Sequence, residues 1–495
     1  MPDIRVTYTG IVSFFLRLAV MAGNMAFLLV MTRSLSTDEY GAWGIIGSML
    51  AYAVVAEVIV GYWVSREIAR GKESGPAALA TSGILSVGGT AAYVLLAVLV
   101  GAQSGADPYV LLLAAALVPL RYVQATLSKI NLSWRPHTTS YALVVQSVLH
   151  VPLSLLLIYQ LDWGIAGAVA TVLAGQAACC AMLAAYAREK LRGRPDLGRA
   201  RRWFRLSWVS IYPTIAAIIF RVDVLAVAAL AGSVTLVASW TAVFTVAFTI
   251  THASQVATAL YPRLLGGTGA AHVRDNMALF FYLGIPLAAV IIVLARPIMY
   301  ALNPAYEEAH LALSILSVGM FLTALTAVLQ LILEGNEDVD SGRSSGRDIL
   351  GSRLFLVPTV NAVQYLGYIG ALAAALLYLG GSVPDAQMLL AWACIATASR
   401  VPAVIYQYVL ARRDVGLEVG ASSVARYLAA AACAFGAVYL LQGGLPAAPL
   451  AELLPALLGL AAAGTAAYAA ITCAIDGRAR GLAAAAVRRM GRARQ

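Results

Sequence analysis

The chain has few charged residues. Only 12% of its 495 residues are Asp, Glu, Lys or Arg, whereas 61% are hydrophobic. Its mean hydropathy of +0.81 lies well above that of ordinary soluble domains. The shortage of charge excludes a typical water-soluble protein, and the recurrence of long apolar windows predicts an all-α membrane protein.

Cysteine and several common catalytic motifs are also scarce or missing. The five cysteines all fall within apolar windows and show neither a C-x-x-C pair nor a metal-ligand spacing. We therefore expect no metal site and assign these cysteines to the core. The chain has no Walker A motif and no H-E-x-x-H motif, so nothing indicates ATP hydrolysis or zinc proteolysis. The sequence predicts a protein without enzymatic activity or cofactor, and it does not distinguish Na⁺ from H⁺ as a coupling ion.

What the chain does have is fourteen apolar windows, most of them about as long as a membrane-spanning helix. The first window carries Arg17 and Asn24 where the core of a signal peptide would be uniformly apolar, so we interpret it as a spanning helix. The windows are residues 8–32, 40–64, 77–100, 109–130, 139–160, 164–187, 206–230, 234–260, 277–300, 309–333, 354–380, 387–410, 427–442 and 451–474.

Basic residues gather in alternate connections, above all in 188–205 and in the C-terminal tail. Because cytoplasmic loops carry an excess of Lys and Arg, this pattern predicts that both termini are cytoplasmic. The net charge of +10 then reflects topology and attraction to anionic lipid headgroups. We expect no nucleic-acid partner.

Short connections leave no room for a large soluble domain. We predict an N-terminal six-helix bundle over 1–187, a basic cytoplasmic linker over 188–205 and a C-terminal six-helix bundle over 206–411. Residues 412–495 would add two further spanning helices and a basic tail. Such bundles are expected to be related by a pseudo-two-fold axis along the membrane normal, with a substrate site at their interface.

A shift of 197 residues supports this internal repeat, because it aligns the helix boundaries of the two predicted bundles without a gap. The aligned identities are Trp43 with Trp240, Ser36 with Ser233, Ala56 with Ala253, Arg66 with Arg263, and Tyr109 with Tyr306.

Four arginines lie inside the apolar windows: Arg17, Arg121, Arg221 and Arg400. Each costs about 2.5–3.5 kcal/mol at the centre of a membrane helix. A wet, positively charged space between helices would remove this cost and would suit an anionic passenger. A guanidinium stays protonated there and matches phosphate oxygens with a planar fork. We therefore predict that these four arginines bind substrate, together with Asn24, which lies two turns from Arg17.

Two carboxylates, Glu57 and Asp223, also lie within the windows. One interpretation makes them ion-coupling groups. The alternative is that they pair with the arginines and hold helices together. Two carboxylates can neutralise at most two of the four arginines. Even if both pair in this way, two arginines remain to bind an anion.

Four stretches resemble polysaccharide-biosynthesis flippases, the Wzx-type members of the multidrug/oligosaccharidyl-lipid/polysaccharide exporter superfamily. RSLSTDEYGAWG (33–44) is similar to their R-x-L-s-x-x-e-y-G connection. FRVDVLAVAALAGS (220–233), ALYPRL (259–264) and YEEA (306–309) are similar to three later motifs. The match covers most of the chain up to about residue 410, through the order and spacing of these stretches.

The resemblance implies alternating access by two bundles around a central cavity, and transport of an undecaprenyl- or dolichyl-linked oligosaccharide for cell-surface polysaccharide or glycan biosynthesis. Asp223 matches the family's helix-7 aspartate, and Arg17 matches a cationic position of its first helix. The expected place is the cytoplasmic membrane of a prokaryote. The expected partners are the lipid-linked oligosaccharide, membrane lipids, and glycosyltransferases and a polymerase of the same pathway.

Two alternatives are less favoured. A multidrug and toxin exporter of the same superfamily would carry cationic drugs and should have a cavity rich in carboxylates. A membrane glycosyltransferase should have a large outer domain or an acidic, metal-binding outer loop, whereas the predicted outer connections are short.

Overall fold

The computed structural model describes residues 20–104, 107–205, 207–259, 269–335, 352–380, 382–417, 419–443, 445, 448–477 and 480. Within these ranges every regular element is a helix, which confirms the predicted all-α class. The chain packs into two compact units. The N-terminal unit comprises Met1–Ser239 with Leu376–Gly381, and the C-terminal unit comprises Trp240–Ala375 with Ser382–Gln495.

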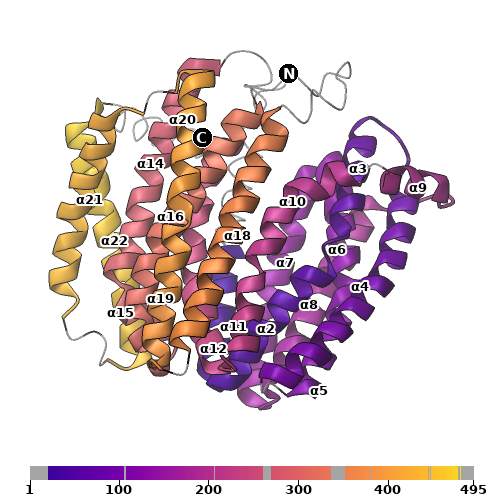
Figure 1. The fold of residues 1–495 in the computed structure, drawn as a ribbon, viewed down its shortest axis with the longest axis horizontal. Helices are drawn as coiled ribbons and strands as arrows, with labels where there is room; N and C mark the ends of the chain where they lie inside the picture. The colour runs from indigo at the N-terminus through magenta and orange to yellow at the C-terminus, as the bar shows by residue number, and fades with distance from the viewer. Residues whose placement is uncertain are drawn as a thin grey trace, which may run out of the picture. The chain divides into compact units, whose positions relative to one another are not determined.

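In the N-terminal unit, α6 packs against α3, α4 and α8, and α7 packs along α8 (Figure 1). The helices of this unit are Val20–Ser34, α2 (Thr37–Ala53), α3 (Glu57–Ala69), α4 (Gly75–Ser104), α5 (Pro108–Leu113), η1 (Ala114–Ala116), α6 (Leu117–Trp134), α7 (Pro136–Ser154), η2 (Leu155–Gln160), α8 (Gly164–Ala187), α9 (Leu197–Arg205), α10 (Trp208–Phe220), α11 (Val222–Leu230) and the start of α12 (Val234–Phe248).

In the C-terminal unit, α21 and α22 pack on each other and on α14 (Figure 1). A Cβ on Gly464 would lie 2.6 Å from the ring of Phe435, so α21 and α22 approach closely. Besides the rest of α12, the helices of this unit are η3 (Thr249–Ala259), α14 (Gly269–Val293), α15 (Ala295–Leu302), η4 (Pro304–Ala309), α16 (His310–Gly335), α18 (Arg353–Leu379, apart from its end), α19 (Asp385–Ala398), α20 (Arg400–Val415), α21 (Ala421–Leu441) and α22 (Leu450–Ile475).

The helices follow the predicted windows. All fourteen windows are helical over most of their described residues. In the part of the chain that the structure describes, eleven helices are long and apolar enough to cross a membrane, or up to twelve if the bent pair α2–α3 is one span. The first window is helical over Val20–Ser34 in its described part, and the seventh is divided into α10 and α11.

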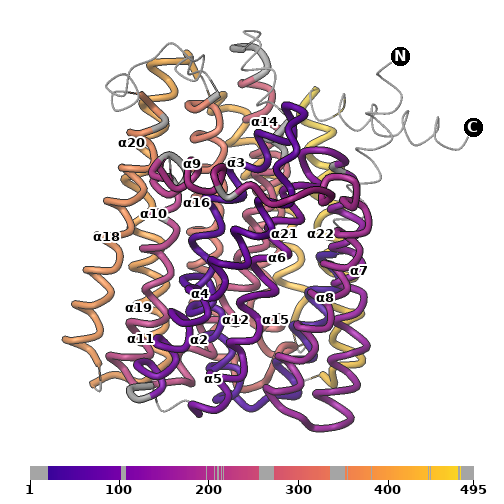
Figure 2. The backbone as a smooth tube through the Cα atoms, turned by 90° about the vertical axis from the view of Figure 1, so that its right-hand side faces the viewer, coloured from indigo at the N-terminus to yellow at the C-terminus, as the bar shows by residue number. Residues whose placement is uncertain are grey.

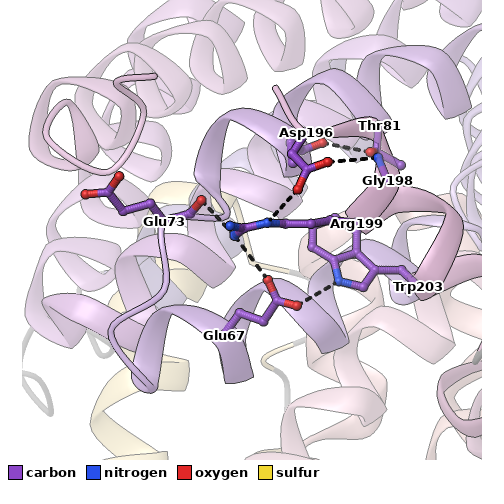
Figure 3. A network of polar contacts seen from close by, with 8 residues as sticks. Glu67, Glu73, Thr81, Asp196, Gly198, Arg199 and Trp203 are labelled. Carbon is purple, nitrogen blue, oxygen red and sulfur yellow. Dashed lines mark hydrogen bonds and ion pairs between the residues drawn. The ribbon is translucent and has the colours of Figure 1, made fainter. Parts of the chain in front are cut away.

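The predicted basic linker is held against the N-terminal unit rather than projecting from it. Trp203 of α9 is 1% exposed and donates from Nε1 to Glu67 of α3 at 3.1 Å. Arg199 pairs with Glu67 at 3.7 Å and with Asp196 at 3.1 Å (Figure 3). These contacts place α9 across the ends of α3 and α4 (Figure 2). The basic segment and the α3–α4 connection therefore share one end of the unit, as the topology prediction requires.

The motif that joins the first two windows has a structural role. Ser36 accepts from the amide of Glu39 at 3.2 Å, and Glu39 accepts from the amide of Ser36 at 3.0 Å, which forms a capping box at the start of α2. Glu39 also accepts from the amide of Ile165 at 3.2 Å and so joins α2 to α8. At Gly41 a Cβ would lie 2.2 Å from the carbonyl oxygen of Val234, so only glycine permits this approach.

Local structure recurs near the predicted repeat shift. Ser233 accepts from the amide of Leu236 at 3.1 Å, three residues on, as its aligned partner Ser36 does in its own cap. Asp107 and Asn303, one residue off the same shift, both cap helices whose next residue is proline. The symmetry of the two bundles remains a prediction.

The compact units divide at Ser239, whereas the sequence predicts that the second bundle begins at residue 206. Helices α10 and α11 pack with α2, α3 and α4. Tyr52 of α2 donates its hydroxyl to the carbonyl oxygen of Ile218 in α10 at 2.8 Å. By packing, the seventh span therefore belongs to the N-terminal unit, and counting apolar windows does not reveal such contacts.

Candidate functional site

A cavity of about 410 Å³ lies within the N-terminal unit, where two of its helical spans are interrupted. It receives side chains from α2, α3, α6, α7 and the junction between α10 and α11. The lining residues are Gly47, Leu50, Ala51, Val54, Glu57, Arg121, Gln124, Ala125, Ser128, Leu143 and Arg221.

The first interruption separates α2 from α3, which meet at an angle of 57°. The carbonyl oxygen of Ala53 accepts from the hydroxyl of Tyr122 at 2.9 Å, so a side chain replaces the helical bond lost at the bend. Glu57 begins α3 directly after the bend and lines the cavity. The segment 51–58, AYAVVAEV, contains neither proline nor glycine, and the bend therefore has no signal in the sequence.

The second interruption lies at Arg221, which ends α10 and precedes α11. Arg221 follows the C-terminus of α10, where the helix dipole favours a cation. Asp223 lies in the first turn of α11, where the dipole favours an anion, and it accepts from the amide of Val224 at 2.7 Å. Discontinuous spans of this kind form substrate and ion sites in transporters.

Arg121 brings a positive charge to the cavity. Its Nη1 donates to the side-chain oxygen of Gln124 at 3.4 Å. Gln124 in turn donates to Gln146 at 2.6 Å. Among the described residues no carboxylate lies within ion-pair distance of Arg121. A guanidinium held by neutral amides keeps its charge available to an anion.

Glu57 is the single carboxylate of the cavity. It is 9% exposed, and its Oε1 has no hydrogen-bond partner in the described part of the chain. The side chains of Glu57 and Lys129 both approach Gly61, where a Cβ would lie 2.7 Å from Glu57 and 3.2 Å from Lys129. The described lining of the cavity thus contains two guanidiniums and one carboxylate.

The structure brings together three of the residues that the sequence predicts for the site: Arg121, Arg221 and Glu57. Asp223 is 2% exposed and lies two residues from the cavity lining without belonging to it. Tyr52 of α2, which donates its hydroxyl to Ile218, lies near both Asp223 and Arg221.

The other predicted residues lie elsewhere or are not described. Arg400 belongs to the C-terminal unit, is 4% exposed, donates from Nε to Thr323 at 2.7 Å, and donates from Nη1 to the carbonyl oxygen of Ala396. Asn24 accepts from Ser147 at 3.2 Å and does not line the cavity. Arg17, like most of the ALYPRL stretch, lies outside the described residues. The structure places Arg121 and Arg221 in one cavity. That Arg17 and Arg400 line the same cavity remains a prediction.

Sequence reasoning missed the polar residues that surround Arg121. Gln124 and Ser128 of α6 line the cavity, and Gln146 of α7 supports Gln124. Gln124 lies three residues after Arg121, a spacing that puts two side chains on the same helix face. That spacing was the available signal, whereas Gln146 is joined to the site only by tertiary packing.

No protein-family model matches this chain, and no curated protein matches it. Solved structures do. The lipid II flippase MurJ in an inward closed conformation gives a TM-score of 0.67 at 11% identity, covering 95% of this chain and 98% of that chain. An inward-facing multidrug resistance MATE family transporter of the MOP superfamily gives a TM-score of 0.58 at 15% identity, covering 79% of this chain and 94% of that chain. The Vibrio cholerae MATE transporter VcmN in the bent form gives a TM-score of 0.55 at 14% identity, covering 82% of this chain and 97% of that chain.

At these identities the likeness establishes the fold alone: the chain has the fold of the MurJ flippase and of these MATE transporters. The two MATE structures are matched over nearly their whole length, yet they leave about a fifth of this chain unmatched. The match to MurJ leaves only 5% unmatched, fewer residues than α21 and α22 contain together. The likeness to MurJ therefore extends into the last two helices.

Proposed function

We propose that this protein is a flippase that moves a polyprenyl-(pyro)phosphate-linked oligosaccharide from the inner to the outer leaflet of a prokaryotic cytoplasmic membrane by alternating access. The observation that carries the proposal is the cavity with Arg121 and Arg221 against the single carboxylate of Glu57. The likeness in fold to a lipid II flippase over 95% of the chain supports a lipid-linked substrate.

In the proposed mechanism the two guanidiniums hold the phosphate oxygens, because each offers parallel N–H donors that match an oxyanion. Gln124 and Ser128 present neutral hydrogen-bonding groups beside them, and such groups suit sugar hydroxyls. The polyprenyl tail would stay in the bilayer. Glycosyltransferases that complete the oligosaccharide on the cytoplasmic side and a polymerase on the outer side would then act before and after this step.

A cationic-drug exporter is the second candidate, because MATE transporters share the fold. A cavity with an excess of guanidiniums repels a cation, and this charge balance disfavours the second candidate.

Flipping by the purified full-length chain tests the proposal. Liposomes would hold a fluorescent undecaprenyl pyrophosphate oligosaccharide, and a membrane-impermeant quencher would report the fraction that remains in the outer leaflet. We expect the chain to make the inner-leaflet pool accessible to the quencher, while liposomes without protein stay protected. Transport of ethidium with no movement of the lipid-linked probe would instead assign the chain to the drug exporters.

We further propose Glu57 as the ion-coupling group of the cavity and Asp223 as a second one. Glu57→Gln removes the single negative charge from the lining and should strengthen headgroup binding by about 1–2 kcal/mol, about five- to thirtyfold. It should also remove the dependence of flipping on Na⁺ or pH. Flipping rates across a sodium and a pH series would measure this, with Asp223→Asn in parallel. Unchanged ion dependence in both variants would exclude these carboxylates from coupling.

A further inference from the structure

A second cavity, of about 300 Å³, lies entirely within the C-terminal unit. It is enclosed by the beginning of α14, the beginning of α21 and the residue that follows α22. The lining residues with polar side chains are Arg274, Ser422, Ser423, Arg426, Tyr427 and Asp476.

The predicted topology assigns this end of the unit to the cytoplasmic face. The connection before α21 and the segment after α22 are both predicted cytoplasmic, and the structure joins them, because Tyr427 donates its hydroxyl to Asp476 at 2.6 Å. With this predicted topology, the cavity is expected at the depth of the lipid headgroups of the inner leaflet.

The two arginines of this cavity come from different helices, and neither is neutralised by a described residue. Arg426 donates from Nε to the carbonyl oxygen of Ser422 at 3.2 Å and from Nη1 to that of Ile475 at 3.5 Å, and it makes no ion pair. Arg274 makes no hydrogen bond or ion pair with any residue in the described ranges, and its side chain is exposed. Two guanidiniums thus line one cavity, and neither makes an ion pair with a described residue.

The backbone adds to this positive character. Gly420 precedes the 21-residue α21 and has no side chain with which to cap it. No side chain caps α21, and the amides of Ser423 and Val424 donate to the carbonyl oxygen of Gly420. Because Gly420 and Ser422 line the cavity, the positive end of the helix dipole lies beside it. The hydroxyls of Ser422 and Ser423 are further donors. Asp476, the one acidic residue of the lining, is 5% exposed and is engaged by Tyr427.

We propose that this cavity binds the phosphate of an anionic phospholipid headgroup from the cytoplasmic leaflet. Basic pockets between membrane helices on the cytoplasmic side bind such headgroups. The bound phosphate would connect α14 to α21 and so fasten the last two helices to their unit. The inference is independent of the proposed flippase activity, because it concerns a different cavity and a different ligand.

Lipid-induced thermal stabilisation of the detergent-purified full-length chain tests it. We expect phosphatidylglycerol to raise the melting temperature, whereas phosphatidylcholine and inorganic phosphate do not. Arg274→Ala and Arg426→Ala should each raise the phosphatidylglycerol concentration needed for half-maximal stabilisation about tenfold. Arg413→Ala, which removes an exposed guanidinium of α20 outside the cavity lining, is the matched control and should respond normally.

Ser422→Glu gives a variant that should fold, because an acidic residue in the first turn of a helix is favourable. Its carboxylate should repel the phosphate and abolish the response to phosphatidylglycerol. If inorganic phosphate alone stabilised the protein, the ligand would not be a phospholipid. If Arg413→Ala lost the response to phosphatidylglycerol as strongly as Arg274→Ala and Arg426→Ala, the cavity would not be the binding site. None of these measurements depends on flipping, so failure here and failure of the proposed function are distinguishable.

Discussion

Replacing Arg121 and Arg221 together by alanine is expected to weaken binding of undecaprenyl pyrophosphate about 100-fold or more and to stop flipping. Removing each guanidinium would cost the headgroup a charge-assisted hydrogen bond worth about 1.5–3 kcal/mol, and every 1.4 kcal/mol changes the dissociation constant about tenfold. Both side chains line the same cavity, so one headgroup can contact both. Binding of the lipid to the protein in nanodiscs, followed by native mass spectrometry, would measure the loss.

Two further variants separate charge from geometry. Arg121→Lys with Arg221→Lys keeps both charges but loses the planar forks, so we expect an intermediate loss. Arg135→Ala removes a guanidinium that stacks on Trp134, 4.1 Å from the ring centroid and outside the cavity lining, and should bind normally. Binding within twofold of the unmodified protein in the double alanine variant would contradict the anion site.

Trp392→Ala is expected to cause the largest loss of stability in the C-terminal unit. Trp392 of α19 is fully buried, stacks on Trp240 of α12 with ring centroids 3.9 Å apart, and donates from Nε1 to the hydroxyl of Tyr368 in α18 at 2.7 Å. Alanine would remove the stack, leave a cavity and break the hydrogen bond to the Tyr368 hydroxyl. We expect a cost of about 3 kcal/mol or more, measured as a fall in the melting temperature.

Tyr368→Phe should cost only about 1 kcal/mol, because it removes one hydrogen bond and keeps the packing. Trp163→Ala, at a tryptophan that is 53% exposed, serves as the control for loss of an indole. A melting temperature of Trp392→Ala equal to that of the Trp163 variant would show that the stack contributes little.

Much of the fold could be predicted because it follows from composition and local pattern. Apolar windows of spanning length must become helices in a bilayer, where backbone groups find partners within the helix. The starts of helices were equally local: Ser36 and Glu39 form a capping box from residues three apart. The alternation of basic connections likewise agrees with α9 and the α3–α4 connection sharing one end.

The interruptions of the spans could not be predicted. The bend after Ala53 rests on the hydroxyl of Tyr122, which lies far away in the sequence, and the segment itself contains no helix breaker. The assignment of α10 and α11 to the N-terminal unit likewise rests on contacts such as that of Tyr52 with Ile218. Hydropathy reports how long an apolar segment is and carries no information about which neighbour it touches.

The sequence by itself determined which charges this protein buries in its apolar spans, because a guanidinium or carboxylate among hydrophobic residues is visible without coordinates and its cost in a membrane demands an explanation. Only the tertiary structure decided which of these charges meet. It placed Arg121, Arg221 and Glu57 in one cavity, because two spans break beside the same space, and it held Arg400 against Thr323 and Ala396 in the other unit. It also added Gln124 and Gln146, because a hydrogen bond between two helices is a property of their packing and not of either helix alone.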